Sequence, residues 1–198
     1  MTKQKFLNIF IWAFLIAGLI LILGKKDWFP DFYSPKFFGL FSFVSAFLII
    51  LPSLIFRADE SVKKEALLNL RIVMAVSLLL NGLGSLGLFQ LYKFGFEYDK
   101  VIHFGIALML VIPLSSFIFY WYGLNFKKSV FMAVMIMISA GFVWELLEYF
   151  ADLIFGTKTF GVYGTEVIKD TILDLVMDFA GAGMAIIFLF RKKILDNK

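Results

Sequence analysis

Residues 101–122 read VIHFGIALMLVIPLSSFIFYWY, an apolar run in which His103 is the one side chain that titrates near neutral pH. A transmembrane helix needs about 20 predominantly apolar residues, so this run predicts a membrane span. Five other segments meet the same criterion, at about residues 6–24, 37–56, 72–92, 130–155 and 171–190. We therefore predict an all-α, polytopic membrane bundle of six transmembrane helices, which forms a single integral membrane domain over residues 1–198.

The composition agrees with a membrane protein. Of 198 residues, 61% are hydrophobic and 17% are charged, and the mean hydropathy is +0.89. Soluble domains are nearer half apolar and a quarter charged, so this chain has more apolar surface than one core can bury. The absence of Cys excludes disulfides, thiolate metal sites and a cysteine nucleophile. A single His excludes bis-histidine haem and multi-histidine zinc sites.

The positions of the basic residues predict the orientation, because Lys and Arg are enriched in cytoplasmic loops. Twelve of the 19 lie in the N-terminus, the 57–71 and 123–129 loops and the C-terminal tail, against seven in the alternate loops. Both termini are therefore expected in the cytoplasm, and the net charge of +4 reflects topology rather than nucleic acid binding. The first run ends in Gly24-Lys25-Lys26 without a small-x-small cleavage site, so we expect a retained span.

Two further segments have a structural interpretation. Residues 58–70 are amphipathic and are expected to lie on the cytoplasmic surface before the third span. The G-x-G-x-x-G sequence of Gly82, Gly84 and Gly87 is a dinucleotide fingerprint only between a strand and a helix. In mid-membrane it indicates close helix packing, as do Gly181 and Gly183 with Ala185 in the last span.

Ionisable residues gather on one face of each of the last three spans. At about 100° per residue, Asp99 and His103 lie about 40° apart, and each of two acidic trios lies within about 80°. The trios are Glu145, Glu148 and Asp152 at the end of span five, and Asp170, Asp174 and Asp178 at the start of span six. With the predicted orientation, all three faces lie in the outer half of the bilayer. They describe a polar funnel that reaches toward the membrane centre.

So many buried carboxylates need protons or a cation, because an ionised acid at mid-membrane costs about 2.5–3.5 kcal/mol or more. Carboxylate and imidazole ligands suit a divalent ion such as Mg, Mn, Ca, Zn or Fe. We predict that Glu148, Asp174, Asp178, Asp170 and Asp152 are metal ligands. His103, Glu145 and Asp99 are the predicted acid–base residues.

Some of these residues have simpler interpretations. Asp99 has the position of an N-cap, Asp170 lies in a first helical turn where an acid suits the helix dipole, and Asp152 has an interfacial position. Trp144 and Tyr149 are expected to be packing or interface residues. The glycine-rich connection of residues 156–170 lies over the funnel mouth and is either a plain connector or a lid.

The same residues carry a family resemblance. The Asp99-to-His103 opening, Trp144-Glu145 with Glu148, and Asp170-Thr171 with Asp174 resemble the motifs of the uncharacterised bacterial inner-membrane family typified by YjdF. More distantly, the Asp-Lys-x-x-His opening is similar to that of VanZ-like membrane proteins. The resemblance implies a multi-pass protein of the bacterial plasma membrane, and it supplies no reaction.

Three functions remain open from the sequence. The first is a metal-dependent enzyme that acts on a lipid or cell-envelope substrate from the outer leaflet, with membrane lipids as its surroundings. The second is a proton- or cation-coupled transporter or channel that uses the same carboxylates. The third is a non-catalytic subunit whose acids bind a basic segment of another membrane protein. The acids occupy only the outer half and no inverted repeat is evident, which favours the enzyme over the transporter.

Overall fold

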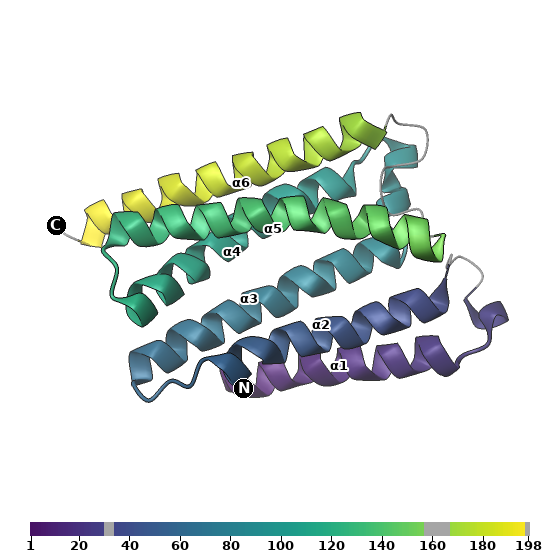
Figure 1. Cartoon of the computed structure of the whole chain (residues 1–198), viewed down its shortest axis with the longest axis horizontal. Coiled ribbons are helices and arrows are strands. Elements are labelled where there is room, and N and C mark those ends of the chain that lie inside the picture. Colours follow the sequence, from purple (N-terminus) through teal and green to yellow (C-terminus); the bar gives the residue numbers. More distant parts are fainter. Residues whose placement is uncertain (30–33, 157–166, 197–198) are drawn as a thin grey trace.

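The computed structural model describes residues 1–29, 34–156 and 167–196, and six long helices run alongside one another in it (Figure 1). All six are long and apolar enough to cross a membrane, which confirms the predicted multi-pass helical bundle. Two short 3-10 helices, η1 (Lys26–Trp28) and η2 (Leu88–Phe94), lie in connections. The long helices are α1 (Lys3–Leu23), α2 (Pro35–Ile55), α3 (Ser61–Ser85), α4 (Tyr98–Tyr122), α5 (Phe126–Phe155) and α6 (Val167–Asp196).

The bundle has two halves that meet at α3. Helix α1 packs on α2, whereas α4 contacts α3, α5 and α6. One apolar cluster includes Leu7 and Ile49 of the first half, and a second includes Val111 and Ala182 of the other half. Helix α3 contributes Ala75 to the first cluster and Leu67 and Leu70 to the second. It therefore forms the shared wall of both cores.

Local signals set the ends of several spans. The side chains of Thr2, Ser34 and Asn125 accept hydrogen bonds from backbone N–H groups of the first turns of α1, α2 and α5. Gly123 and Gly156 end α4 and α5 in the left-handed conformation, with φ of 62° and 60°. An even number of spans then returns the chain to the side where it started, and both termini lie toward the same end of the bundle (Figure 1).

The third span is present, but its bounds differ from the predicted residues 72–92. Helix α3 begins at Ser61 and ends at Ser85, so most of the predicted surface segment 58–70 is continuous with the span. The charge that obscured this is Arg71, which is buried and donates from Nε to the Ile49 carbonyl of α2 at 2.8 Å. A backbone carbonyl thus satisfies part of a guanidinium inside the bundle.

The glycine motif of residues 82–87 also differs from its prediction. Gly82 and Gly84 lie in the last turn of α3, and Gly87, with a φ of 129°, makes the turn into η2. A Cβ at Gly82 would meet nothing within 4 Å, whereas a Cβ at Gly84 would collide with the Phe89 ring of η2. Close packing therefore holds at Gly84 and not at Gly82. The packing interpretation is confirmed at Gly181 of α6, where a Cβ would collide with the Phe104 carbonyl of α4.

A pair of alanine substitutions in α6 tests this close approach. We expect Gly181→Ala to destabilise the bundle by about 1–3 kcal/mol, because α4 has to move away from the added methyl group. Gly183→Ala is the matched control, since its Cβ would meet nothing within 4 Å. Thermal unfolding in detergent measures both variants. Equal melting temperatures for the two would show that the α4–α6 contact tolerates a wider spacing.

Candidate functional site

The first turns of α4 and α6 and the outer half of α5 bring ionisable residues together at one end of the bundle. Six of these residues are buried, with exposed fractions between 3% and 8%. They are Lys100 and His103 of α4, Glu145 of α5, and Asp170, Asp174 and Asp178 of α6. Asp99 of α4 lies beside them and is half-buried. We call these seven residues the acidic cluster.

His103 lies at the centre of four carboxylates. Its Nδ1 atom is 3.3 Å from Oδ1 of Asp178. Its Nε2 atom is 3.8 Å from Oδ1 of Asp174 and 3.9 Å from the nearest oxygens of Asp99 and Glu145. The two ring nitrogens therefore face different partners, with one acid at Nδ1 and three at Nε2.

Lys100 joins the start of α4 to the start of α6. Its ammonium donates to both oxygens of Asp174, at 2.7 and 2.8 Å, and to Oδ1 of Asp170. It also lies 3.2 Å from Oδ2 of Asp99. One buried cation thus holds three carboxylates, and Asp174 is shared between Lys100 and His103.

The structure tests the simpler interpretations of Asp99 and Asp170. Glu97, not Asp99, occupies the N-cap of α4, so the capping interpretation of Asp99 is wrong and its carboxylate contacts Lys100 and His103 instead. Asp170 lies in the first turn of α6, where its charge suits the helix dipole, and it also pairs with Lys100. An acid in a first turn can therefore interact favourably with the helix dipole and also pair with a buried lysine.

The remaining predicted acids lie at the edge of the cluster. Trp144 donates from Nε1 to Oε1 of Glu148 at 2.7 Å, and its ring packs edge-on against Phe41 of α2. Asp152, one turn further out, is half-buried and is followed by the end of α5 at Phe155. Its proposed role as a ligand stays a prediction. Most of the predicted lid falls in residues 157–166, outside the described residues.

Small residues leave room for the cluster. A Cβ at Gly141 of α5 would collide with the carboxylate of Asp178. Asp178 is 3% exposed, and its Oδ2 atom has no hydrogen-bond partner among the described residues. A buried carboxylate oxygen without a donor is costly, so Asp178 is a candidate to contact a ligand.

The charges of the cluster do not balance from the chain alone. Five carboxylates surround one ammonium and one imidazole. Oxygen and imidazole nitrogen atoms of Asp99, His103 and Asp174 all lie within 4.8 Å of one another, a spacing from which they could hold a metal ion. Of these three residues, only Asp174 is among the predicted metal ligands, whereas Asp99 and His103 were predicted as acid–base residues.

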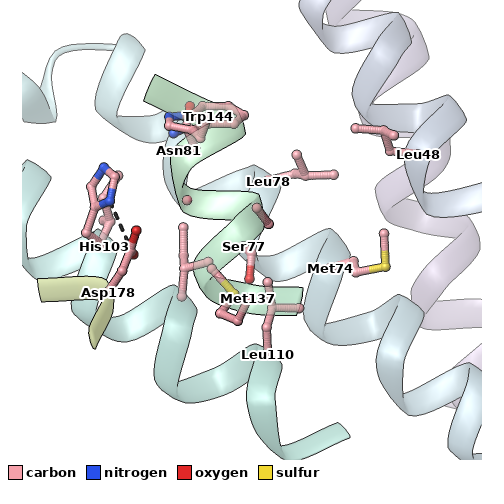
Figure 2. A pocket seen from close by; sticks show the side chains of 14 residues that line it. Leu48, Met74, Ser77, Leu78, Asn81, His103, Leu110, Met137, Trp144 and Asp178 are labelled. Carbon is pink, nitrogen blue, oxygen red and sulfur yellow. Dashed lines mark hydrogen bonds and ion pairs between the residues drawn. The ribbon is translucent and has the colours of Figure 1, made fainter. Parts of the chain in front are cut away.

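A cavity of about 260 Å³ opens beside the cluster (Figure 2). His103 and Asp178 lie on one side of it, and Leu48 of α2 with Met74 of α3 lie on the opposite side. Most of the remaining wall is apolar and comes from α3, α4 and α5, with Ser77, Asn81 and Trp144 as its other polar side chains.

Sequence reasoning missed the role of Lys100 and the cavity. No role was predicted for Lys100, although it precedes His103 by three residues and so lies about 60° from it on the helix. That angle would have indicated that Lys100 reaches the same acids. The cavity depends on the spacing between α2, α3 and α5, for which the sequence carries no signal.

The sequence matches, over residues 5–193, a family described as "Predicted membrane protein (DUF2238)". An uncharacterised protein of Thermotoga maritima is 29% identical over 114 residues, and the match covers 52% of each chain. The chain therefore spans about half the length of that relative. No solved structure matches it. The finer resemblance to YjdF and VanZ-like proteins stays a prediction.

Substitution of Lys100 by Met tests its role as the buried cation. We expect Lys100→Met to lower the free energy of unfolding by about 3–5 kcal/mol, because it leaves the carboxylates of Asp170 and Asp174 buried without their partner. Lys93→Met, at an exposed lysine of η2, is the control. Thermal unfolding of both variants in detergent is the measurement, and a loss no greater than in the control would contradict a stabilising network.

Proposed function

We propose that this chain, which belongs to the DUF2238 family of predicted membrane proteins, is a metal-dependent enzyme acting on a lipid or cell-envelope substrate from the outer leaflet. The observation that supports the proposal best is the convergence of Asp99, His103 and Asp174 from α4 and α6. Neither helix carries all three donors, so the site exists only in the folded bundle.

Two of the three separations between these donors fit one shared ion. Ligands at about 2.0–2.2 Å from a metal lie no more than about 4.4 Å apart. The Nε2 atom of His103 is 3.8 Å from Asp174 and 3.9 Å from Asp99, both inside that limit. Asp99 and Asp174 are also two of the three carboxylates that Lys100 holds, so an ion at this position would compete with the Lys100 ammonium for both of them.

The orientation of His103 supports Nε2 as the ligand atom. Asp178 lies next to Nδ1, and a carboxylate that accepts from one ring nitrogen leaves the other free of its proton for a metal. Asp178 is then a positioning residue for His103. Glu145, 3.9 Å from Nε2 and from a different helix, is placed to accept a proton from a substrate hydroxyl or water.

The bound ion would supply Lewis acidity, which polarises a phosphoryl or acyl oxygen or lowers the pKa of water. The residues of the chain do the remaining work. Lys100 offsets negative charge on Asp170 and Asp174, Asp178 orients His103, and Glu145 takes the proton. Hydrolysis or transfer at a polar head group that lies at the outer interface is the reaction class that these roles support.

The packing below the cluster favours an enzyme over a carrier. The apolar core that continues α4 and α6 toward the other end includes Ala107, Val111, Ala182 and Ala185, which are at most 1% exposed. A transporter that moves ions past these helices needs polar groups at that level, or a second way of packing the helices that opens a path there. Among the described residues, the buried carboxylates all lie at one end of the bundle.

Elemental analysis of the purified protein tests the metal. We expect wild-type protein to hold about one divalent ion. Asp174→Asn should lose it, because Asp174 is one of the three proposed donors. Asp59→Asn, an exposed acid in the 56–60 connection at the opposite end, is the matched control and should keep the ion. Folded wild-type protein that binds no added Mg, Mn, Ca, Zn or Fe would sink the proposal.

A second substitution separates the ligands from the positioning residue. We expect Asp178→Asn to weaken metal binding by about 10–100-fold without abolishing it, the usual effect of losing a carboxylate that orients a histidine ligand. Titration of metal-free protein by calorimetry measures the change. Complete loss of binding would instead make Asp178 a direct ligand, as the sequence alone predicts.

A further inference from the structure

We propose that the cavity beside the acidic cluster is the binding site for a single aliphatic chain whose hydroxyl-bearing end contacts Asp178. This inference rests on the proposed function for its meaning as a substrate site. It narrows the substrate class to an amphiphile with one chain that leaves the lipid layer and enters the protein.

The lining of the cavity supports a hydrocarbon occupant. Four helices supply mostly aliphatic and thioether groups, and His103 and Asp178 are the ionisable residues of the wall. The volume of about 260 Å³ exceeds the roughly 150 Å³ of an apolar cavity that binds benzene. It lies just below the usual range of about 300–1,000 Å³ for ligand pockets, a size for one chain segment rather than a two-chain lipid body.

The depth of the cavity agrees with a chain that lies along α4. His103 and Leu110 both line it, and they are seven residues apart. At about 1.5 Å per residue the cavity extends about 10 Å from the cluster toward the other end of the bundle. On the α5 side, Ala140 is both exposed and part of the lining, so the cavity reaches the outer surface of the helices there.

Asp178 provides the second, independent observation. Its Oδ2 atom is buried and has no hydrogen-bond partner among the described residues, and the residue lines the cavity. Figure 2 shows its carboxylate pointing toward His103 at the polar side of the cavity. A hydroxyl donor at the end of an entering chain satisfies this oxygen and lies next to the donors proposed for the metal.

Trp144, which also lines the cavity, gives a direct readout of chain binding. The probe is a bromine-terminated undecanol, whose bromine quenches nearby tryptophan fluorescence. The protein keeps Trp144 as its only tryptophan, with phenylalanine in place of the other three, Trp12, Trp28 and Trp121. We expect saturable quenching that unbrominated undecanol reverses, and weaker binding of bromoundecane, which lacks the hydroxyl group.

A cavity-filling variant and a matched control decide the location. Ala140→Phe fills the mouth of the cavity and displaces at least two methylenes. At about fourfold in affinity per methylene, binding should weaken by about 15-fold. Ala180→Phe makes the same change at an exposed α6 position that does not line the cavity, and it should leave binding unchanged. Quenching that rises linearly and equally in all three proteins would overturn the proposed chain site.

The two proposals fail separately. Saturable quenching in protein that binds no metal would reject the metal-dependent enzyme and keep a lipid-binding cavity. A stoichiometric metal with non-saturable quenching would reject the chain site and keep the metal site. Ala140→Phe should retain the metal content of the wild type, because Ala140 lies on α5 whereas the proposed metal ligands come from α4 and α6.

Discussion

The ion pair between Lys100 and the two acids of α6 is the constraint on which the site depends. The ammonium lies between Asp170 and Asp174, and its side chain is 7% exposed. Separating such charges inside a bundle is costly, so the first turns of α4 and α6 keep a fixed register. Further along the same two helices, Gly181 allows the α6 backbone to approach the Phe104 carbonyl. A charged contact at the end and a close backbone contact below it align the faces that carry His103 and Asp178.

This register divides the acids by the basic residue, Lys100 or His103, that each one faces. Asp170 faces Lys100, Glu145 and Asp178 face His103, and Asp99 and Asp174 face both. The shared pair is where the proposed metal ion would compete with the Lys100 ammonium for the same oxygens. Lys100 therefore stabilises the cluster without a metal and, on the proposed function, would set the affinity for one. A tighter metal site would need a weaker Lys100 contact, at a cost to the folded bundle.

The sequence predicted the spans and the polar faces because both are local properties. Hydropathy over about 20 residues depends on the helix itself, and the periodic spacing of Asp170, Asp174 and Asp178 depends only on the helical repeat. The start of α3 at Ser61 was not predictable in this way. Arg71 made residues 61–71 look interfacial, and only the Ile49 carbonyl of a different helix explains its burial. The partners of Lys100 and the cavity likewise depend on contacts between helices.

Asp99 shows how the same limit applies within the site. Its position near the start of α4 fits a cap, and nothing nearby in the chain separates that role from a ligand role. The distinction comes from Asp174, 75 residues away, which brings an oxygen to His103 and a second carboxylate to Lys100. Local sequence thus identifies charged residues whose burial in a membrane costs free energy. The packing of distant helices determines which partners compensate for that cost. In this protein, Oδ2 of Asp178 has no hydrogen-bond partner among the described residues, and the residue lines an apolar cavity at the polar end of the bundle. A molecule that donates a hydrogen bond to this oxygen and also fills the cavity has to be polar at one end and aliphatic along the rest.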